Sequence, residues 1–470
     1  MIFSSITFLF YFLPIFLFFY FISKYRNGVI LCGSLLFYAW GELYYVLLLI
    51  ASIVINYTIG LKIFRSGAKR WWLALGIILN LIPLILFKYL NLIVDTINPL
   101  IDMVKGEPIL LPAIHLPLGI SFFTFQAISY LIDVYRNEAP AEEKIFPVAF
   151  YISMFPQLLA GPIVRFNTIA SALHHRPENS SQFATGIRFF IIGLSQKVLL
   201  ANTLTLPVDQ LFSLPLAEIS FALSWLAAIG YTLQIYYDFA GYSNMAIGLG
   251  RMLGFGLPQN FNYPYLSQSI TEFWRRWHIT LSQWFRDYLY IPLGGSRKGP
   301  MRLYLNLLIV FFICGLWHGA SYTFIIWGLY YGFFLIFERM GLKSVLERFP
   351  RPIRHLYALL IIVVGWIVFR SNSFDQAFAF IKAMAGFQTG GNNYTLSQYL
   401  SPDLIAALSL GVFLSGPHLQ ISRAISTSIL KPKIITWLPM VETFTLIVCF
   451  VFVAMCLASG AYQPFIYFRF

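Results

Sequence analysis

Two histidines lie beside tryptophans in apolar parts of this sequence, and their setting indicates acid–base chemistry. His278 lies in EFWRRWHITLSQWFRDYLYIPLGG, residues 272–295, and His318 lies in GLWHGA, residues 315–320. An imidazole has an unperturbed pKa of about 6.5, so it can take a proton from a hydroxyl nucleophile near neutral pH. For His318, the alternative is a neutral histidine that bonds a backbone carbonyl where two helices cross.

The place of His318 in its apolar run favours a functional role. A helix that begins near Leu303, after the basic segment 297–302, rises about 24 Å before it reaches His318. Ionisable residues at such depth in a membrane are costly and mark functional sites. The neighbouring glycines, Gly315 and Gly319, leave room for a substrate or for the backbone of another helix.

The residues around His278 predict one amphipathic helix. Aromatic and apolar side chains recur every three or four positions, at Trp274, Trp277, His278, Leu281, Trp284, Phe285 and Tyr288. The opposite stripe is polar, with Arg276, Thr280, Gln283 and Asp287. A helix of this kind can lie among lipid headgroups, which accounts for the tryptophans and arginines but not for a histidine among them.

Asp238 is a third candidate, in QIYYDFAGYSNMAIGLG, residues 234–250. A buried carboxylate must be paired or protonated. Asp238 either orients a histidine or forms an ion pair with Arg275 or Arg276, and the ion pair is the preferred interpretation. The glycines of this segment predict close helix packing, because no strand precedes them as a dinucleotide site would require.

The elements that position these residues are predicted to be membrane helices. Of the 470 residues, 59% are hydrophobic and only 11% are charged, whereas about a quarter of a soluble domain is charged. The composition excludes a soluble or disordered chain and predicts an all-α polytopic membrane protein with about 11 to 13 transmembrane or re-entrant helices. The expected spans are about 6–22, 29–40, 43–61, 71–87, 116–135, 145–163, 183–203, 221–237, 303–318, 320–338, 354–369, 404–417 and 435–458.

The net charge of +13 is distributed as in a membrane protein. Basic residues form short clusters between apolar runs, which the positive-inside rule places in the cytoplasm, and nucleic-acid binding is not expected. These clusters are Lys24 and Arg26, Lys62 to Arg70, 339–354, and Arg423 with Lys431 and Lys433. Both termini and the polar segment 371–402 are then external. The cysteines and histidines lack metal-ligand spacing, so no metal site is expected.

The three motifs together resemble the membrane-bound O-acyltransferase family, in particular its bacterial branch for alginate O-acetylation. The segments MIFSSITFLFYFLPIFL, PLGISFFTFQAISYLIDVYR and FPQLLAGPIVRF are also similar to that branch, and the resemblance thins after about Arg370. It implies a single integral membrane domain over residues 1–470, with the core motifs in about 116–340 and C-terminal helices over 341–470. The helices would surround a central funnel.

The resemblance also assigns roles to single residues. It places the catalytic histidine at His318 and the second family histidine at His278, with Trp317, Asp238 and Asn244 in support. The branch often has an aspartate where this chain has Asn244, so this chain lacks a charge there. Basic side chains that can hold the phosphates of the donor are Arg275, Arg276, Arg297 and Lys298. Cys314, four residues before His318, is a less favoured acyl relay.

The implied reaction moves acetyl from cytoplasmic acetyl-CoA to an extracytoplasmic polysaccharide of the alginate type. Acetyl-CoA is then a substrate, and no bound cofactor is expected. A periplasmic or extracellular partner acetyltransferase with a Ser-His-Asp site would complete the transfer, and the chain would lie in the bacterial inner membrane. Peptidoglycan or another cell-wall glycan is an alternative acceptor. The alternative from another class, a transporter of polysaccharide or lipid-linked sugar, is less favoured because no internal repeat is detected.

Overall fold

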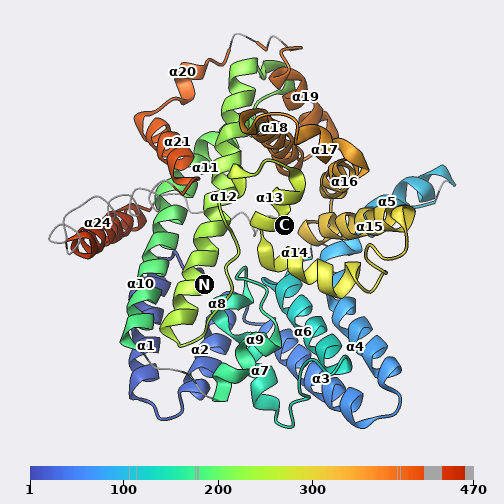
Figure 1. The fold of residues 1–470 in the computed structure, drawn as a ribbon, viewed down its shortest axis with the longest axis vertical. Coiled ribbons are helices and arrows are strands. Elements are labelled where there is room, and N and C mark those ends of the chain that lie inside the picture. The colour runs from blue at the N-terminus through green and yellow to red at the C-terminus, as the bar shows by residue number, and fades with distance from the viewer. Residues whose placement is uncertain are drawn as a thin grey trace. The chain divides into compact units, whose positions relative to one another are not determined.

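The computed structural model describes residues 1–470 except 105, 113, 175, 177–178, 389, 392, 418–436 and 461–470, and every regular element within the described part is helical (Figure 1). Seven helices are long and apolar enough to cross a membrane: Val46–Arg65, Lys69–Met103, Ser180–Phe212, Pro300–His318, Tyr322–Leu346, Arg351–Arg370 and Pro439–Ala458. Shorter apolar helices are Thr7–Ile22, Ile120–Tyr135 and Pro402–Leu414. The expected all-α polytopic class is confirmed. The basic cluster of Arg423, Lys431 and Lys433 lies outside the described residues.

Several of the expected spans have different bounds in the structure. The span near 183–203 lies within the helix Ser180–Phe212, and the span near 221–237 continues to Met252 in α12 (Phe221–Met252). The span near 71–87 continues to Met103 as one helix of 35 residues. The span expected over 145–163 is broken at Met154, where α7 (Ile145–Ser153) ends before the short α8 (Phe155–Leu158). The ring of Pro156 has no N–H for an α-helical hydrogen bond and would clash with the preceding turn, which explains the break.

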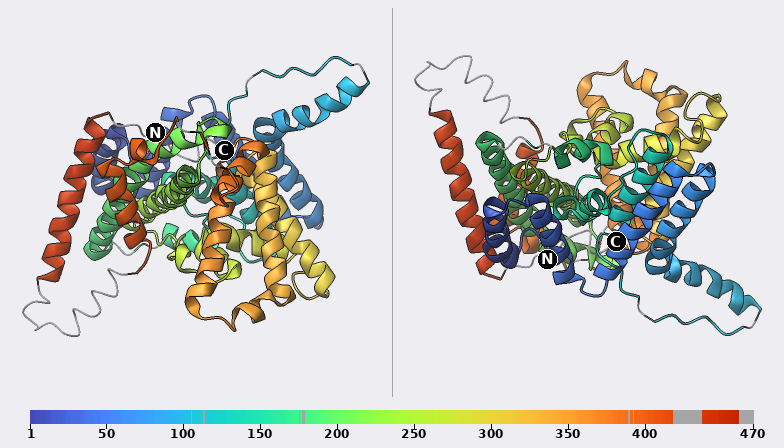
Figure 2. Two further views of the ribbon diagram at one scale, coloured as in Figure 1. Left: turned by 90° about the horizontal axis from the view of Figure 1, so that it is seen from above. Right: turned by 90° about the horizontal axis from the view of Figure 1, so that it is seen from below.

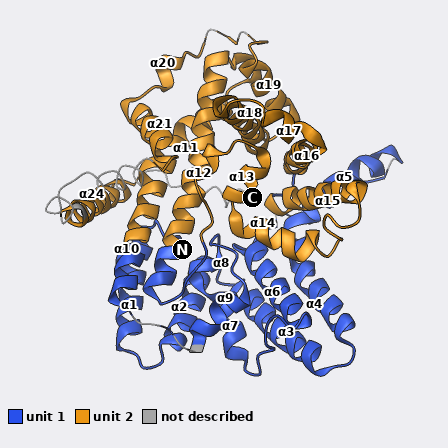
Figure 3. Cartoon of the chain, viewed as in Figure 1, with its two compact units in different colours: residues 1–187, 246–258, 319–321 blue, residues 188–245, 259–318, 322–470 orange. Residues whose placement is uncertain are grey.

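The chain forms two compact units (Figure 3). Unit 1 comprises Met1–Ile187, Ala246–Pro258 and Gly319–Ser321, and unit 2 comprises Arg188–Met245, Gln259–His318 and Tyr322–Phe470. All the residues that the sequence singles out for chemistry or donor binding lie in unit 2.

Unit 1 contains the N-terminal helices. They are η1 (Thr7–Phe12), α1 (Leu13–Ile22), α2 (Arg26–Gly41), α3 (Val46–Arg65), α4 (Lys69–Leu84), η2 (Ile85–Tyr89), α5 (Leu90–Met103), α6 (Ile120–Tyr135), α7, α8 and α9 (Phe166–His174). Phe155 is the centre of an aromatic cluster in this unit, with ring centroids 5.2 to 6.3 Å away in Phe3, Phe8, Phe12, Phe16 and Phe37. Helix α6 is largely enclosed, because 14 of its 16 residues are buried.

Unit 2 contains most of the remaining helices. The first are η3 (Gln196–Ala201), which follows α10 (Ser180–Ser195), then α11 (Asn202–Phe212), η4 (Leu216–Glu218), α12 (Phe221–Met252, of which 246–252 belong to unit 1), η5 (Pro264–Leu266), α13 (Ile270–Arg276), α14 (Ile279–Phe285) and η6 (Arg286–Tyr290). The later ones are α15 (Pro300–His318), α16 (Tyr322–Phe337), η7 (Glu338–Leu342), α17 (Lys343–Leu346), α18 (Arg351–Arg370), α19 (Phe374–Met384), α20 (Leu396–Tyr399), α21 (Pro402–Leu414) and α24 (Leu438–Ala458).

Helices α15 and α16 pack side by side at two glycines, and α18 packs against α16 (Figure 2). A Cβ atom on Gly315 would overlap the carbonyl oxygen of Phe324, and one on Gly328 would overlap that of Phe311. Only glycine permits this approach of two backbones. The space beside Gly315 is therefore filled by a neighbouring helix, and it does not accommodate a substrate.

Candidate active site

His318 is the last residue of α15 and lies in an aromatic box. Its ring meets those of Trp317, Trp327 and Phe369 edge to face, with centroids 5.0, 4.9 and 5.3 Å away. Trp327 belongs to α16 and Phe369 to α18, so three helices fix the imidazole. The helix starts at Pro300, beside the basic residues, and rises about 27 Å to His318, in agreement with the hydropathy pattern.

His278 interrupts the helix that the aromatic spacing predicts. Helix α13 ends at Arg276 and α14 begins at Ile279, while His278 has φ 42° and ψ 55°, in the left-handed region. Such a conformation is uncommon for a residue with a side chain and persists where surrounding contacts enforce it. Here the loop 259–269 enforces it, because Ile279 N donates to Asn260 O at 2.9 Å and Asn262 N donates to Arg276 O at 2.9 Å.

The hydrogen bonds of Asn260 define the tautomer of His278. Imidazole Nδ1 lies 3.1 Å from Asn260 Oδ1, and the same oxygen accepts from Thr280 N at 3.3 Å and Thr280 Oγ1 at 3.0 Å. The other amide atom, Nδ2, donates to Ser243 Oγ at 3.1 Å. A backbone N–H can only donate, so Oδ1 is an acceptor and Nδ1 of His278 carries the proton.

The second nitrogen of His278 is therefore its basic atom. Nε2 is buried and has no hydrogen-bond partner within the part of the chain that the structure describes. Burial, and to a lesser extent the charge of His318, hold the pKa of His278 well below its ordinary value. The ring of Trp317 contacts both imidazoles, with centroids 6.0 Å from His278 and 5.0 Å from His318. The two histidines thus share one aromatic neighbour.

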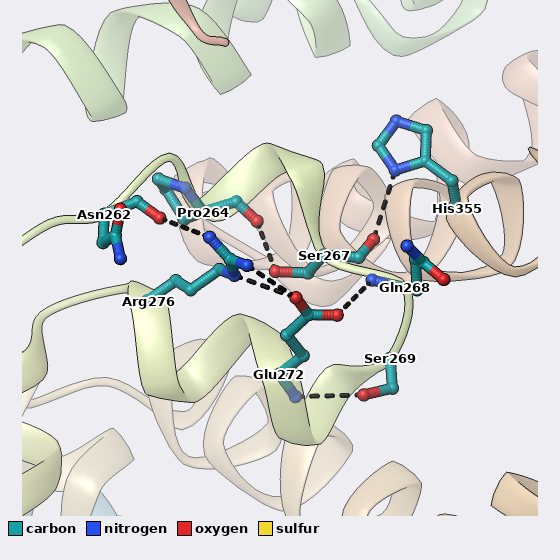
Figure 4. Close-up of polar contacts among 8 residues, drawn as sticks. All are labelled: Asn262, Pro264, Ser267, Gln268, Ser269, Glu272, Arg276 and His355. Atoms are coloured by element: carbon teal, nitrogen blue, oxygen red, sulfur yellow. Dashed lines mark hydrogen bonds and ion pairs between the residues drawn. The ribbon is translucent and has the colours of Figure 1, made fainter. Parts of the chain in front are cut away.

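Arg276 holds the loop beside His278 in place (Figure 4). Its Nε and Nη2 each lie 2.9 Å from Glu272 Oε1, and its Nη1 donates to Asn262 O at 3.1 Å. The other oxygen of Glu272 accepts from Gln268 N at 2.9 Å. Arg276, which the sequence suggests as a donor contact, is therefore engaged in tying the loop to α13.

Two further contacts complete this attachment. Ser269 Oγ accepts from Glu272 N at 3.0 Å and caps the start of α13. His355, in the first turn of α18, lies 3.2 Å from Ser267 O through Nδ1. The loop that supplies Asn260 is thus fixed to both α13 and α18, so the Asn260 amide has little freedom to move away from His278.

Asp238 forms an ion pair, but its partner is neither Arg275 nor Arg276. It pairs with Lys197 of η3, and the two side chains are only 3% and 2% exposed. Asn244, on the same helix α12, donates to Gln196 Oε1 at 2.8 Å. Asp238 and Asn244 therefore join α12 to η3. Lys197 is a lone charge in an apolar run of the sequence, which is the signal that could have identified it.

A cavity of about 400 Å³ lies beside α13, α14 and α15. Its cationic wall consists of Arg275, Arg286 and Arg339, and its apolar wall includes Phe311 and the buried Cys314, one helical turn before His318. Of the four basic residues suggested by the sequence, only Arg275 lines it. Arg297 and Lys298 are exposed in the turn before α15. The sequence does not single out Arg286, because it lies outside the basic clusters. It uses Arg339 only as part of the 339–354 cluster that indicates the cytoplasmic side.

The fold and the site define a helical membrane protein with two buried histidines and an adjoining cationic cavity. Comparison with known proteins agrees with this class. The family model described as MBOAT, membrane-bound O-acyltransferase family, matches residues 143–374. The chain belongs to this family and is a multi-pass membrane O-acyltransferase, as the motifs predict. Within the described residues, no group of three His, Cys, Asp or Glu side chains is placed to hold a metal ion.

The similar proteins act on cell-surface polymers, by their names. The chain is 45% identical to the probable alginate O-acetylase AlgI of Pseudomonas aeruginosa, over 83% of this chain and 76% of that protein. It is 40% identical to the probable alginate O-acetylase AlgI of Pseudomonas putida over the full length of both. It is 36% identical to the peptidoglycan O-acetyltransferase of Helicobacter pylori, over 82% of this chain and 80% of that protein.

Proposed function

We propose that this chain takes acetyl from cytoplasmic acetyl-CoA and delivers it for O-acetylation of an extracytoplasmic polysaccharide, with alginate as the favoured acceptor. The observation that carries the proposal is the pair of buried imidazoles that both contact Trp317, next to a cavity with a cationic wall. The names and identities of the Pseudomonas relatives support the acetyl group and the acceptor class.

The cavity supports a coenzyme A donor. Arg275 and Arg339 provide charge-assisted hydrogen-bond donors for phosphates, whereas Arg286 on the same wall is paired with Asp287. The apolar wall suits the uncharged pantetheine arm, and Cys314 on that wall is one turn from His318. The thioester would therefore point along α15 toward the catalytic histidine. Arg275 is common to this set and to the one that the sequence suggests, whereas Arg276 is held by Glu272.

The reaction assigned to the histidines is a direct acyl transfer. The acceptor hydroxyl oxygen attacks the thioester carbonyl carbon, the C–S bond breaks, and the hydroxyl proton passes to His318 and then to the departing thiolate. A base placed at the hydroxyl typically contributes about 10² to 10⁴ in rate. His278, with Nδ1 fixed by Asn260 and Nε2 bare, would accept a hydrogen bond from the incoming hydroxyl and orient it.

The acceptor hydroxyl need not belong to the glycan itself. A periplasmic or extracellular acetyltransferase with a Ser-His-Asp site would take the acetyl group and pass it on. The positive-inside pattern supports a bacterial inner membrane location with the donor cavity open to the cytoplasm, because Arg339 belongs to a basic cluster that the rule places there. Both termini are then external.

Peptidoglycan is the second candidate acceptor, which the 36% identical relative of Helicobacter pylori favours. Membranes that contain this chain, together with a periplasmic acetyltransferase of the proposed Ser-His-Asp type, should be supplied with labelled acetyl-CoA and either alginate or peptidoglycan. We expect base-labile label on alginate. Label confined to peptidoglycan would overturn alginate as the acceptor but retain the acetyltransferase activity. Label on neither polymer, with folded protein present, would overturn the proposed function.

A further inference from the structure

Glu338 is a buried carboxylate beside the cationic cavity, and the proposed reaction gives it no role. It is the first residue of η7, directly after α16, and its side chain is almost completely enclosed. The next residue, Arg339, lines the cavity. Burial of a carboxylate is costly unless hydrogen bonds satisfy its oxygens. The donors that Glu338 has acquired therefore indicate what it holds in place.

The carboxylate of Glu338 binds the first turn of α13. Its Oε1 accepts from Ile270 N at 2.5 Å and from the hydroxyl of Tyr357, on α18, at 3.3 Å. Its Oε2 accepts from Thr271 N at 2.9 Å and from Thr271 Oγ1 at 2.6 Å. The first N–H groups of a helix have no acceptor within the helix, and Glu338 satisfies two of them here. Each of its oxygens faces a backbone N–H and must accept, which a carboxylate can do at both atoms and a carboxamide at only one.

These hydrogen bonds connect the two unpaired-wall arginines Arg275 and Arg339 through the backbone. Thr271 and Arg275 both line the cavity and lie one helical turn apart on α13, whereas Arg339 directly follows Glu338 in η7. The separation of Arg275 from Arg339 therefore depends on the bonds between Glu338 and Thr271. Two arginines can bind the phosphates of one ligand together only if their separation fits that ligand, and rigid placement lowers the cost of binding.

We propose that Glu338 is a positioning residue for the acyl donor, which sets the separation at which Arg275 and Arg339 both bind the phosphates of a coenzyme A thioester. This inference rests on the proposed function, because it takes the cavity as the donor site. It also predicts the direction of a charge effect. A negative charge near a phosphate site repels the ligand, so electrostatics alone predicts tighter donor binding when that charge is removed. Positioning predicts weaker binding, because the amide of Glu338→Gln would place N–H against N–H.

Glu338→Gln separates these two effects in the acetyl-transfer reaction. We expect the KM for acetyl-CoA to rise about tenfold with kcat within about twofold of the unaltered protein, since a small misplacement of a binding group is costly. The nucleotide part of coenzyme A, without the pantetheine arm, should act as a competitive inhibitor. Its Ki should rise by the same factor, because it makes the phosphate contacts and lacks the reacting thioester.

Glu347→Gln is the matched control. It makes the same substitution at an exposed residue of α17, whose carboxylate lies 3.8 Å from Lys343 Nζ. The KM for acetyl-CoA and the Ki of the nucleotide should both remain those of the unaltered protein. Melting temperatures in detergent show which variants are folded.

Thr271→Val decides the question if Glu338→Gln does not fold. It keeps the backbone N–H bond to Oε2 but loses the hydroxyl bond, so the KM should rise about threefold. Thr271→Ser, which keeps the hydroxyl, should raise the KM less. An unchanged or lower KM in the folded variants, or a fall in kcat without a rise in KM, would overturn the positioning role.

The unaltered chain distinguishes failure of this inference from failure of the proposed function. If it uses acetyl-CoA but the nucleotide does not inhibit it, the arginines do not bind the donor phosphates and the role of Glu338 is overturned alone. If it transfers no acetyl from acetyl-CoA, the proposed function is overturned and the role of Glu338 with it.

Discussion

His278 and Asn260 share a hydrogen bond of 3.1 Å between imidazole Nδ1 and amide Oδ1. Since Thr280 N donates to the same oxygen, the amide cannot be turned round and the imidazole must donate. Asn260, in an irregular loop, thus determines which nitrogen of His278 is basic. Asn260 acts through His278 and is a positioning residue.

Replacement of Asn260 should affect both rate and pH dependence. Asn260→Leu leaves the Nδ1–H group buried without an acceptor, at a cost of about 1 to 3 kcal/mol, and we expect acetyl transfer to fall at least about tenfold. Asn260→Asp keeps the acceptor but adds a negative charge that favours the imidazolium, so the pKa of His278 rises. The neutral base then requires a higher pH, and the acid limb of the pH–rate profile should move upward.

The matched control is Asn262→Asp, the same substitution two residues along the loop at an exposed side chain. Its pH–rate profile should coincide with that of the unaltered protein. An unshifted acid limb in Asn260→Asp, together with full activity of Asn260→Leu, would show that the tautomer of His278 has no role in the reaction.

Loss of an arginine from the cavity should weaken donor binding. We expect Arg275→Gln and Arg339→Gln each to raise the KM for acetyl-CoA about tenfold with little change in kcat, because each removes a charge-assisted hydrogen bond to a phosphate worth about 1.5 to 3 kcal/mol. Arg297→Gln, in the exposed turn, is the control and should leave KM unchanged. A larger effect from Arg297→Gln than from the cavity arginines would place the donor elsewhere.

The pair of Lys197 and Asp238 should be structural. Lys197→Met removes one charge of a buried ion pair, which typically costs about 3 to 5 kcal/mol, and should lower the melting temperature strongly. The double variant Lys197→Met with Asp238→Leu should recover most of that loss. Melting curves in detergent of the unaltered protein, Lys197→Met, Asp238→Leu and the double variant give the coupling energy between the two side chains. Additive losses, or an Asp238→Asn variant that is stable but inactive, would instead support a role for Asp238 in the chemistry.

Thiol labelling tests the proposed orientation. In a background without native cysteines, Gly67→Cys and Val345→Cys should react with an impermeant reagent only from the cytoplasmic side, and Ser397→Cys only from outside. Gly67 is a suitable position because no atom lies within 4 Å of a Cβ there. Labelling of Gly67→Cys by the impermeant reagent from outside sealed, intact cells would contradict the proposed topology and the proposed direction of acetyl transfer.

The sequence alone predicts the helical membrane class and the position of His318, because both depend on composition and on the length of apolar runs. It does not predict the break at His278. The aromatic residues from Trp274 to Tyr288 keep their helical spacing across that break. The break depends on the loop 259–269, whose backbone forms hydrogen bonds with residues 276 and 279. These partners are too far apart in the sequence for a local pattern to predict the bonds.

Charged pairs are harder to predict from the sequence than single charged residues. The sequence identifies Asp238 as a buried carboxylate that needs a partner, yet Lys197 lies 41 positions earlier and Arg275 and Arg276 are nearer candidates. The choice depends on the packing of α12 against α10 and η3, where a Cβ on Gly193 would overlap the carbonyl oxygen of Gly241. Only the close approach of those backbones brings the lysine to the carboxylate.

The most direct test of the proposed chemistry is transfer of labelled acetyl from acetyl-CoA to the acceptor by membranes that contain the unaltered chain, His318→Ala, His278→Ala or His115→Ala. His115 is the matched control, since it pairs with Glu42 in unit 1 at 3.1 Å. With equal amounts of folded protein, we expect full transfer by His115→Ala, reduced transfer by His278→Ala and none above background by His318→Ala. Transfer by His318→Ala at the rate of the unaltered chain would contradict the assignment of His318 as the catalytic base.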